Sequence, residues 1–123
     1  MLLITSGRIS PLYHSEMRTP GHGTRSVVPY PMTWMHINDA RKLHIREGDC
    51  IWIETRMGRI RQKAHVGWDV PEGMVQVPPS WWYPELPAEE PWSQGVFDCA
   101  ANVLIDDDPE LADKMTATWN ARG

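Results

Sequence analysis

The N-terminal segment combines a glycine turn with side chains that bind anions. An apolar run, Met1 to Ile4, predicts a short buried strand, and Thr5-Ser6-Gly7-Arg8 follows it. His14 comes later in the same polar loop. Glycine lets backbone N–H groups approach an anion, and arginine adds a planar fork of donors. The pattern indicates a loop that meets phosphate.

The candidate binding residues of this loop are Ser6, Gly7, Arg8, Tyr13, His14, Ser15 and Arg18. The alternative is a surface arginine and a turn histidine whose neighbours only satisfy loop backbone. Asn102 is a further candidate, because one amide group both donates and accepts hydrogen bonds. Its alternative is a turn or β-bulge asparagine.

Other catalytic and metal chemistries find little support in the sequence. Asp106-Asp107-Asp108 lacks the glycine and closing glutamate of a calcium loop, so a solvated turn ahead of Pro109 is favoured. The five histidines and two cysteines show no zinc-type spacing. Cys50 and Cys99 are interpreted as two reduced thiols, and no nucleophile–base arrangement is predicted.

Composition and charge limit the partners. With 123 residues, the chain is expected to be one domain. It has no apolar stretch of the roughly 20 residues that span a bilayer and no signal-peptide pattern, so a cytoplasmic protein without membrane contact is expected. Net charge is −4, yet residues 1–65 are basic and residues 66–123 are acidic. The basic residues are scattered in the sequence without aromatic interleaving, which argues against nucleic acid.

Short strands are predicted at 2–5, 50–54, 59–66 and 74–77, with β-type residues also at 34–37. Residues 56–58 predict a hairpin turn. Asn38 is predicted to cap a short helix near 39–44, whereas residues 19–33, rich in Pro and Gly, are predicted to form a loop that cannot be a helix. A last β-like run covers 114–119. The pattern predicts a small, mostly β barrel.

Residues 79–94 are aromatic but too irregular for a regular element. They hold Trp81, Trp82 and Trp92 among prolines and acids. Tryptophan is enriched where an apolar body meets a polar rim. We therefore expect these side chains to lie at an interface with other domains.

The motifs together resemble a known family. Besides the Thr-Ser-Gly-Arg loop with His14, they are Ile37-Asn38-Asp39-Ala40, Ile45-x-x-Gly48-Asp49, the Gly58 hairpin, Val70-Pro71-Glu72-Gly73-Met74-Val75 and Ala101-Asn102-Val103-Leu104. In this order they resemble the molybdopterin dinucleotide-binding domain, the C-terminal domain of the dimethyl sulfoxide reductase family of molybdenum and tungsten oxidoreductases. Trp81-Trp82-Tyr83-Pro84-Glu85 and the 106–110 segment look most like the acetylene hydratase-like branch.

The resemblance implies a mostly β fold, a six-stranded double-psi β-barrel with one or two short helices. It implies binding of molybdopterin guanine dinucleotide through the loop residues above and Asn102, with molybdenum or tungsten carried by the cofactor and no metal ligand in this chain. Residues 1–123 would be one domain of a larger enzyme that contacts the catalytic domains and does not turn over alone.

Two alternatives stay open. The chain resembles, in outline, a free-standing small subunit that docks on a separate catalytic subunit. An independent enzyme on the same barrel, similar to aspartate decarboxylase, is disfavoured, since that family cleaves itself at a Gly-Ser bond and this chain has no Gly-Ser dipeptide.

Overall fold

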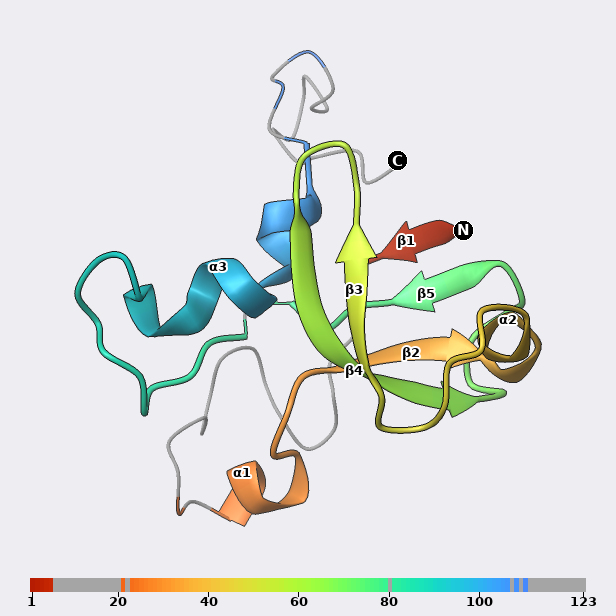
Figure 1. Cartoon of the computed structure of the whole chain (residues 1–123), viewed down its shortest axis with the longest axis horizontal. Coiled ribbons are helices and arrows are strands. Elements are labelled where there is room, and N and C mark those ends of the chain that lie inside the picture. Colours follow the sequence, from red (N-terminus) through yellow and green to blue (C-terminus); the bar gives the residue numbers. More distant parts are fainter. Residues whose placement is uncertain (6–20, 22, 80, 107, 109, 111–123) are drawn as a thin grey trace.

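A computed structural model describes residues 1–5, 21, 23–79, 81–106, 108 and 110. These residues are mostly β: among them, five strands form one sheet in the order β1-β5-β2-β4-β3 (Figure 1). The strands are β1 (Leu2–Ile4), β2 (Met32–His36), β3 (Cys50–Glu54), β4 (Arg59–Gly67) and β5 (Met74–Gln76). All four predicted strands and the β-type run near residue 34 are confirmed within a few residues. The predicted last run at 114–119 lies outside the described residues.

Alternation of side chains explains the longest strand. Along β4, Ile60, Gln62 and Ala64 are buried, while Arg59 and Arg61 between them are exposed. Successive side chains of a strand point to opposite faces, so this sequence buries one face of β4 and leaves the other in solvent. β4 pairs with β3 in an antiparallel hairpin and with β2 in parallel. The predicted hairpin turn at 56–58 is confirmed.

In the described part of the chain, five short helical segments lie around the sheet. They are α1 (Gly23–Val27), α2 (Ile37–Lys42), α3 (Val96–Cys99) and the 3-10 turns η1 (Ser93–Gly95) and η2 (Ala101–Leu104). The sequence predicted one or two helices, so the helical part was underestimated. The prediction that residues 19–33 contain no helix was wrong, because Gly23–Val27 holds no proline and Pro29 follows the helix instead of interrupting it.

The predicted cap of α2 was also wrong. The helix begins at Ile37, and His36 is its N-cap. The His36 imidazole Nδ1 accepts a hydrogen bond from the backbone N–H of Asn38 at 3.2 Å. A histidine ring nitrogen thus takes the acceptor role that Asn38 was expected to fill, and Asn38 lies inside the first turn.

Trp81 corrects the expectation that the tryptophans of 79–94 form an interface. It is fully buried and packs with Cys99 of α3, against the partly buried Val28 and Tyr83. Burial raises the pKa of Tyr83 to about 12. Trp92 is 62% exposed, and its place at an interface stays a prediction. Trp81 therefore anchors its segment to this chain's own core.

Both cysteines are free thiols, as the sequence predicted. Within the described residues, no helix has the length and apolar character needed to cross a bilayer.

Candidate functional site

The candidate binding residues fall into two groups, those outside the described residues and Asn102. Outside the described residues lie Ser6, Gly7, Arg8, Tyr13, His14, Ser15 and Arg18. Asn102 is described, as is the point at which the chain enters the loop. These two features define the part of the candidate site that the structure shows.

The loop begins at the carboxyl end of β1. β1 and β5 are parallel, with Leu2, Leu3 and Ile4 opposite Met74, Val75 and Gln76. Beyond this register, the backbone N–H of Val77 donates to the carbonyl oxygen of Ile4 at 2.8 Å. The segment that follows Thr5 therefore starts beside Val77, at the carboxyl ends of two neighbouring strands.

Asn102 is held at the same corner. Its neighbours in η2, Ala101 and Leu104, are buried in one core cluster with Val77, and Leu3 of β1 packs against that cluster. The Asn102 side chain is exposed. Among the described residues, none forms a hydrogen bond with its amide. We call this region, from the end of β1 to η2, the Asn102 corner.

The β3–β4 hairpin turn holds η2 in place. The hydroxyl of Thr55 donates to the carbonyl oxygen of Leu104 at 2.9 Å. A Cβ atom built on Gly58 would lie 2.9 Å from Cγ1 of Val103, closer than real Cβ contacts. Gly58 is thus required for the turn to pack against the segment that carries Asn102. The sequence marked Gly58 as a turn residue but gave no sign of these two contacts.

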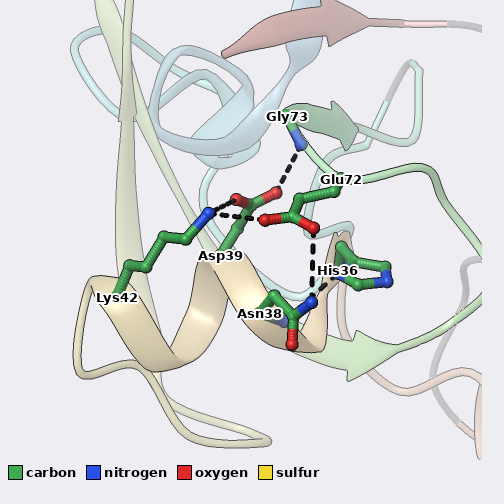
Figure 2. Close-up of polar contacts among 6 residues, drawn as sticks. All are labelled: His36, Asn38, Asp39, Lys42, Glu72 and Gly73. Atoms are coloured by element: carbon green, nitrogen blue, oxygen red, sulfur yellow. Dashed lines mark hydrogen bonds and ion pairs between the residues drawn. The ribbon is translucent and has the colours of Figure 1, made fainter.

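A second polar cluster joins two of the sequence motifs at the other end of β5 (Figure 2). The carboxylate of Asp39 accepts a hydrogen bond from the backbone N–H of Gly73 at 2.6 Å. Lys42 Nζ contacts Glu72 Oε1 at 2.5 Å and Asp39 Oδ1 at 3.6 Å. Asn38 also donates to Glu72 at 3.2 Å. We call Asp39, Lys42, Glu72 and Gly73 the α2 latch, because they tie α2 to the turn before β5.

The latch shifts the titration of its two exposed charges. The hydrogen bond and ion pair with Glu72 raise the pKa of Lys42, and the same contacts, with the Asn38 hydrogen bond, lower the pKa of Glu72. Asp39 is buried and has two partners. All polar groups of the latch are therefore engaged within the chain, which gives it a structural role.

The remaining charged groups of the described residues lie apart or in pairs. Over the described part of the chain, no three His, Cys, Asp or Glu side chains gather so that they could hold a metal ion. His65 lies between Glu47 at 3.3 Å and Asp69 at 3.6 Å. In the acidic 106–110 segment, Asp106 Oδ1 accepts a hydrogen bond from the backbone N–H of Asp108, and Asp108 Oδ1 accepts one from that of Glu110. Such bonds are typical of the solvated turn that the sequence predicts.

Comparison with known proteins identifies the family. The model of the family described as "Molydopterin dinucleotide binding domain" matches residues 2–120. The chain belongs to this molybdopterin dinucleotide-binding domain family. The family to which the sequence motifs pointed is thereby confirmed.

Two curated relatives and one solved structure are similar to the chain. It is 37% identical to dopamine dehydroxylase of Eggerthella lenta over 69% of this chain and 8% of that protein. It is 33% identical to acetylene hydratase of Syntrophotalea acetylenica over 80% of this chain and 14% of that protein. The structure of acetylene hydratase from Pelobacter acetylenicus matches 98% of this chain and 17% of that chain, with a TM-score of 0.89 and 26% identity. The chain thus spans a small fraction of these relatives' lengths.

The Asn102 corner fits a pterin-type ligand in its donor set. A pterin edge presents alternating donors and acceptors, and an exposed carboxamide offers both kinds of group. The amide has no partner among the described residues, so no internal hydrogen bond must break before a ligand binds. The α2 latch offers no such group.

Proposed function

We propose that this chain binds molybdopterin guanine dinucleotide at the Asn102 corner, as the C-terminal cofactor-binding domain of a molybdenum or tungsten oxidoreductase. The bound cofactor supplies the redox chemistry, and the protein supplies orientation and electrostatics. Turnover is not expected of this domain alone.

One observation carries the proposal. The exposed Asn102 amide and the start of the predicted phosphate loop share a corner, since Val77 bonds to the end of β1 and belongs to the same core cluster as Ala101 and Leu104 of η2. The end of β1 and Asn102 are about a hundred residues apart in the sequence, and their proximity supports a shared binding site.

The loop residues complete the proposed site. Arg8 and Arg18 would meet pyrophosphate oxygens, and Gly7 would let backbone N–H groups approach them. His14, with Tyr13, Ser6 and Ser15, would donate to the remaining phosphate or pterin oxygens. These roles remain predictions from the sequence.

The affinity of the isolated chain is expected to be low. Each charge-assisted hydrogen bond contributes about 1.5–3 kcal/mol. Association costs several kcal/mol, so two or three such bonds leave a dissociation constant of about 1 mM. Tight binding would require the rest of the oxidoreductase to cover the other side of the cofactor.

The test is a titration of the isotopically labelled 123-residue chain with GDP, followed by NMR. We expect shifts in the Asn102 side-chain amide and in residues 6–18. Asn102→Ala should weaken GDP binding several-fold. Asn38→Ala, which removes the same group from α2, is the matched control and should leave the affinity unchanged. Shifts confined to the α2 latch would contradict the site assignment.

The finer features of the family are part of the proposal. We propose that the sheet closes into the six-stranded double-psi barrel, that residues 1–123 form one domain, and that the protein acts in the cytoplasm. Its partners are the catalytic domains of the same oxidoreductase or, in the alternative arrangement, a separate catalytic subunit. Size-exclusion chromatography of the protein purified from its source would distinguish a separate small subunit from a domain of a longer chain.

A further inference from the structure

The outer face of the β3–β4 hairpin carries aromatic and basic side chains from different strands. In the register of the hairpin, Trp52 lies opposite Arg61, and Cys50 lies opposite Lys63. Residues directly opposite in an antiparallel pair share a face. Arg59, Arg61 and Lys63 are alternate residues of β4 and leave the buried face to Ile60, Gln62 and Ala64. Figure 1 shows β3 and β4 side by side, joined by the hairpin turn at the top of the view.

Cation–π contacts fix the geometry of these side chains. The guanidinium carbons of Arg59 and Arg61 lie 4.7 Å and 5.3 Å from the Trp52 ring centroid. Lys63 Nζ lies 3.9 Å from the centroid of the Tyr30 ring. Trp52 is 56% exposed and Tyr30 is 45% exposed. We call Tyr30, Trp52, Arg59, Arg61 and Lys63 the ribbon face.

The cations of the ribbon face have no ion-pair partner among the described residues. No ion pair joins Arg59, Arg61 or Lys63 to an acid within the described part of the chain, although Glu54 lies opposite Arg59 in the register. Arg56 at the tip of the same hairpin is paired with Asp106. The chain as a whole has a net charge of −4, so the positive charge of this face is opposite in sign to the net charge.

We propose that the ribbon face docks a carboxylate-bearing protein surface. The arginine forks match carboxylates bidentately, and their rotamers are already restrained by the Trp52 ring. Arginines two apart on a strand are about 7 Å apart, which matches acidic side chains at alternate positions of an extended segment. Tryptophan and arginine are also the residues that most often dominate protein interfaces. The proposal does not depend on cofactor binding.

Single-stranded nucleic acid fits the same face less well. Bases bind such surfaces by stacking on aromatic rings, and here the guanidinium groups lie over the Trp52 ring.

The test uses the 123-residue chain and two blocked hexapeptides, one of alternating glutamate and valine and one of alternating glutamine and valine. Binding is followed by NMR through the Trp52 indole signal. We expect the glutamate peptide to bind and the glutamine peptide not to bind. Affinity should fall as NaCl rises from about 50 mM to about 300 mM.

Two double variants test whether the peptide binds to the ribbon face. Arg59→Gln with Arg61→Gln should weaken binding of the glutamate peptide at least tenfold, because two charge-assisted hydrogen bonds are lost. Arg41→Gln with Arg46→Gln removes the same charge from exposed positions elsewhere and should change affinity less than twofold. Thermal unfolding of both variants confirms that they fold.

Four results would overturn the proposal: no binding of the glutamate peptide, equal losses in the two double variants, tighter binding of an oligothymidylate than of the peptide, or self-association that the Arg59/Arg61 variant abolishes. The third would assign the face to nucleic acid and the fourth to a second copy of this chain.

Discussion

The two ends of β5 use polar side chains in opposite ways. At the start of β5, the α2 latch engages the carboxylates of Asp39 and Glu72 and the ammonium of Lys42 within the chain. At the end of β5, the Asn102 corner presents an exposed amide without a partner among the described residues. Polar groups that are bonded to each other stabilise a fold, whereas an exposed amide without a partner in the described part of the chain can bond to a ligand.

The supports of the two ends also differ. The latch is fixed by hydrogen bonds to charged groups. The corner is fixed mainly by packing, through Val77, Leu104 and the close approach of Gly58 to Val103. The comparison therefore predicts that substitutions in the latch change stability alone, while substitutions that support the corner change stability and ligand binding together.

The largest expected effect is that of Asp39→Ala. It leaves the Gly73 N–H without its acceptor in a partly buried position, at a cost of about 2–3 kcal/mol in the free energy of unfolding. Urea unfolding measures this loss, and GDP affinity should stay unchanged in the folded variant. Asp98→Ala, on an exposed position, is the control and should cost less than about 0.5 kcal/mol. Equal losses of unfolding free energy in both variants would contradict a stabilising role of the latch.

Gly58→Ala should have the next largest effect. It should lower the free energy of unfolding by about 1–2 kcal/mol, because the added methyl group overpacks against Val103. It should also weaken GDP binding, because the added methyl group displaces η2 and with it Asn102. The unfolding free energy and the NMR titration measure the two effects. Met57→Ala, at an exposed position of the same turn, is the control and should change neither quantity much. A loss of stability with unaltered GDP binding would show that Gly58 does not support the position of Asn102.

A smaller effect concerns the pH dependence of the latch. Because the pKa of Glu72 is lowered in the folded protein, its contribution to stability is present above its ordinary pKa and is lost as pH falls through the lowered value. Because the pKa of Lys42 is raised, its contribution is present below its ordinary pKa and is lost as pH rises through the raised value. Lys42→Met should flatten the stability profile at both extremes, measured by urea unfolding across pH. Lys63→Met is the control and should leave the pH profile of stability unchanged. An unaltered profile in Lys42→Met would contradict the coupling between Lys42 and Glu72.

The smallest expected effect on stability is that of Asn102→Ala, within about 0.5 kcal/mol, since its exposed side chain contacts no partner among the described residues. Thermal unfolding measures it. Together with the weaker GDP binding expected above, this would mark Asn102 as a ligand residue. A large loss of stability would instead show that Asn102 is a structural turn residue.

The sequence by itself determined the strands, the hairpin turn and the family. Alternation is a local property, so Arg59 to Val66 predicts a strand without knowledge of its neighbours, and Gly58 predicts the turn before it. The order of motifs along the chain was specific enough to indicate the family that comparison confirmed.

Only the tertiary structure decided which polar residues are hydrogen-bonded within the chain and which aromatic residues are buried. Whether Trp81 is core or interface depends on Cys99 and Val28, which are distant in sequence. The basic and aromatic residues of the ribbon face are scattered along the chain, and strand pairing alone brings Trp52 beside Arg61. In the same way, Asp39 becomes a latch and Asn102 an open amide because of contacts made across the fold, and these contacts leave no local pattern in the sequence.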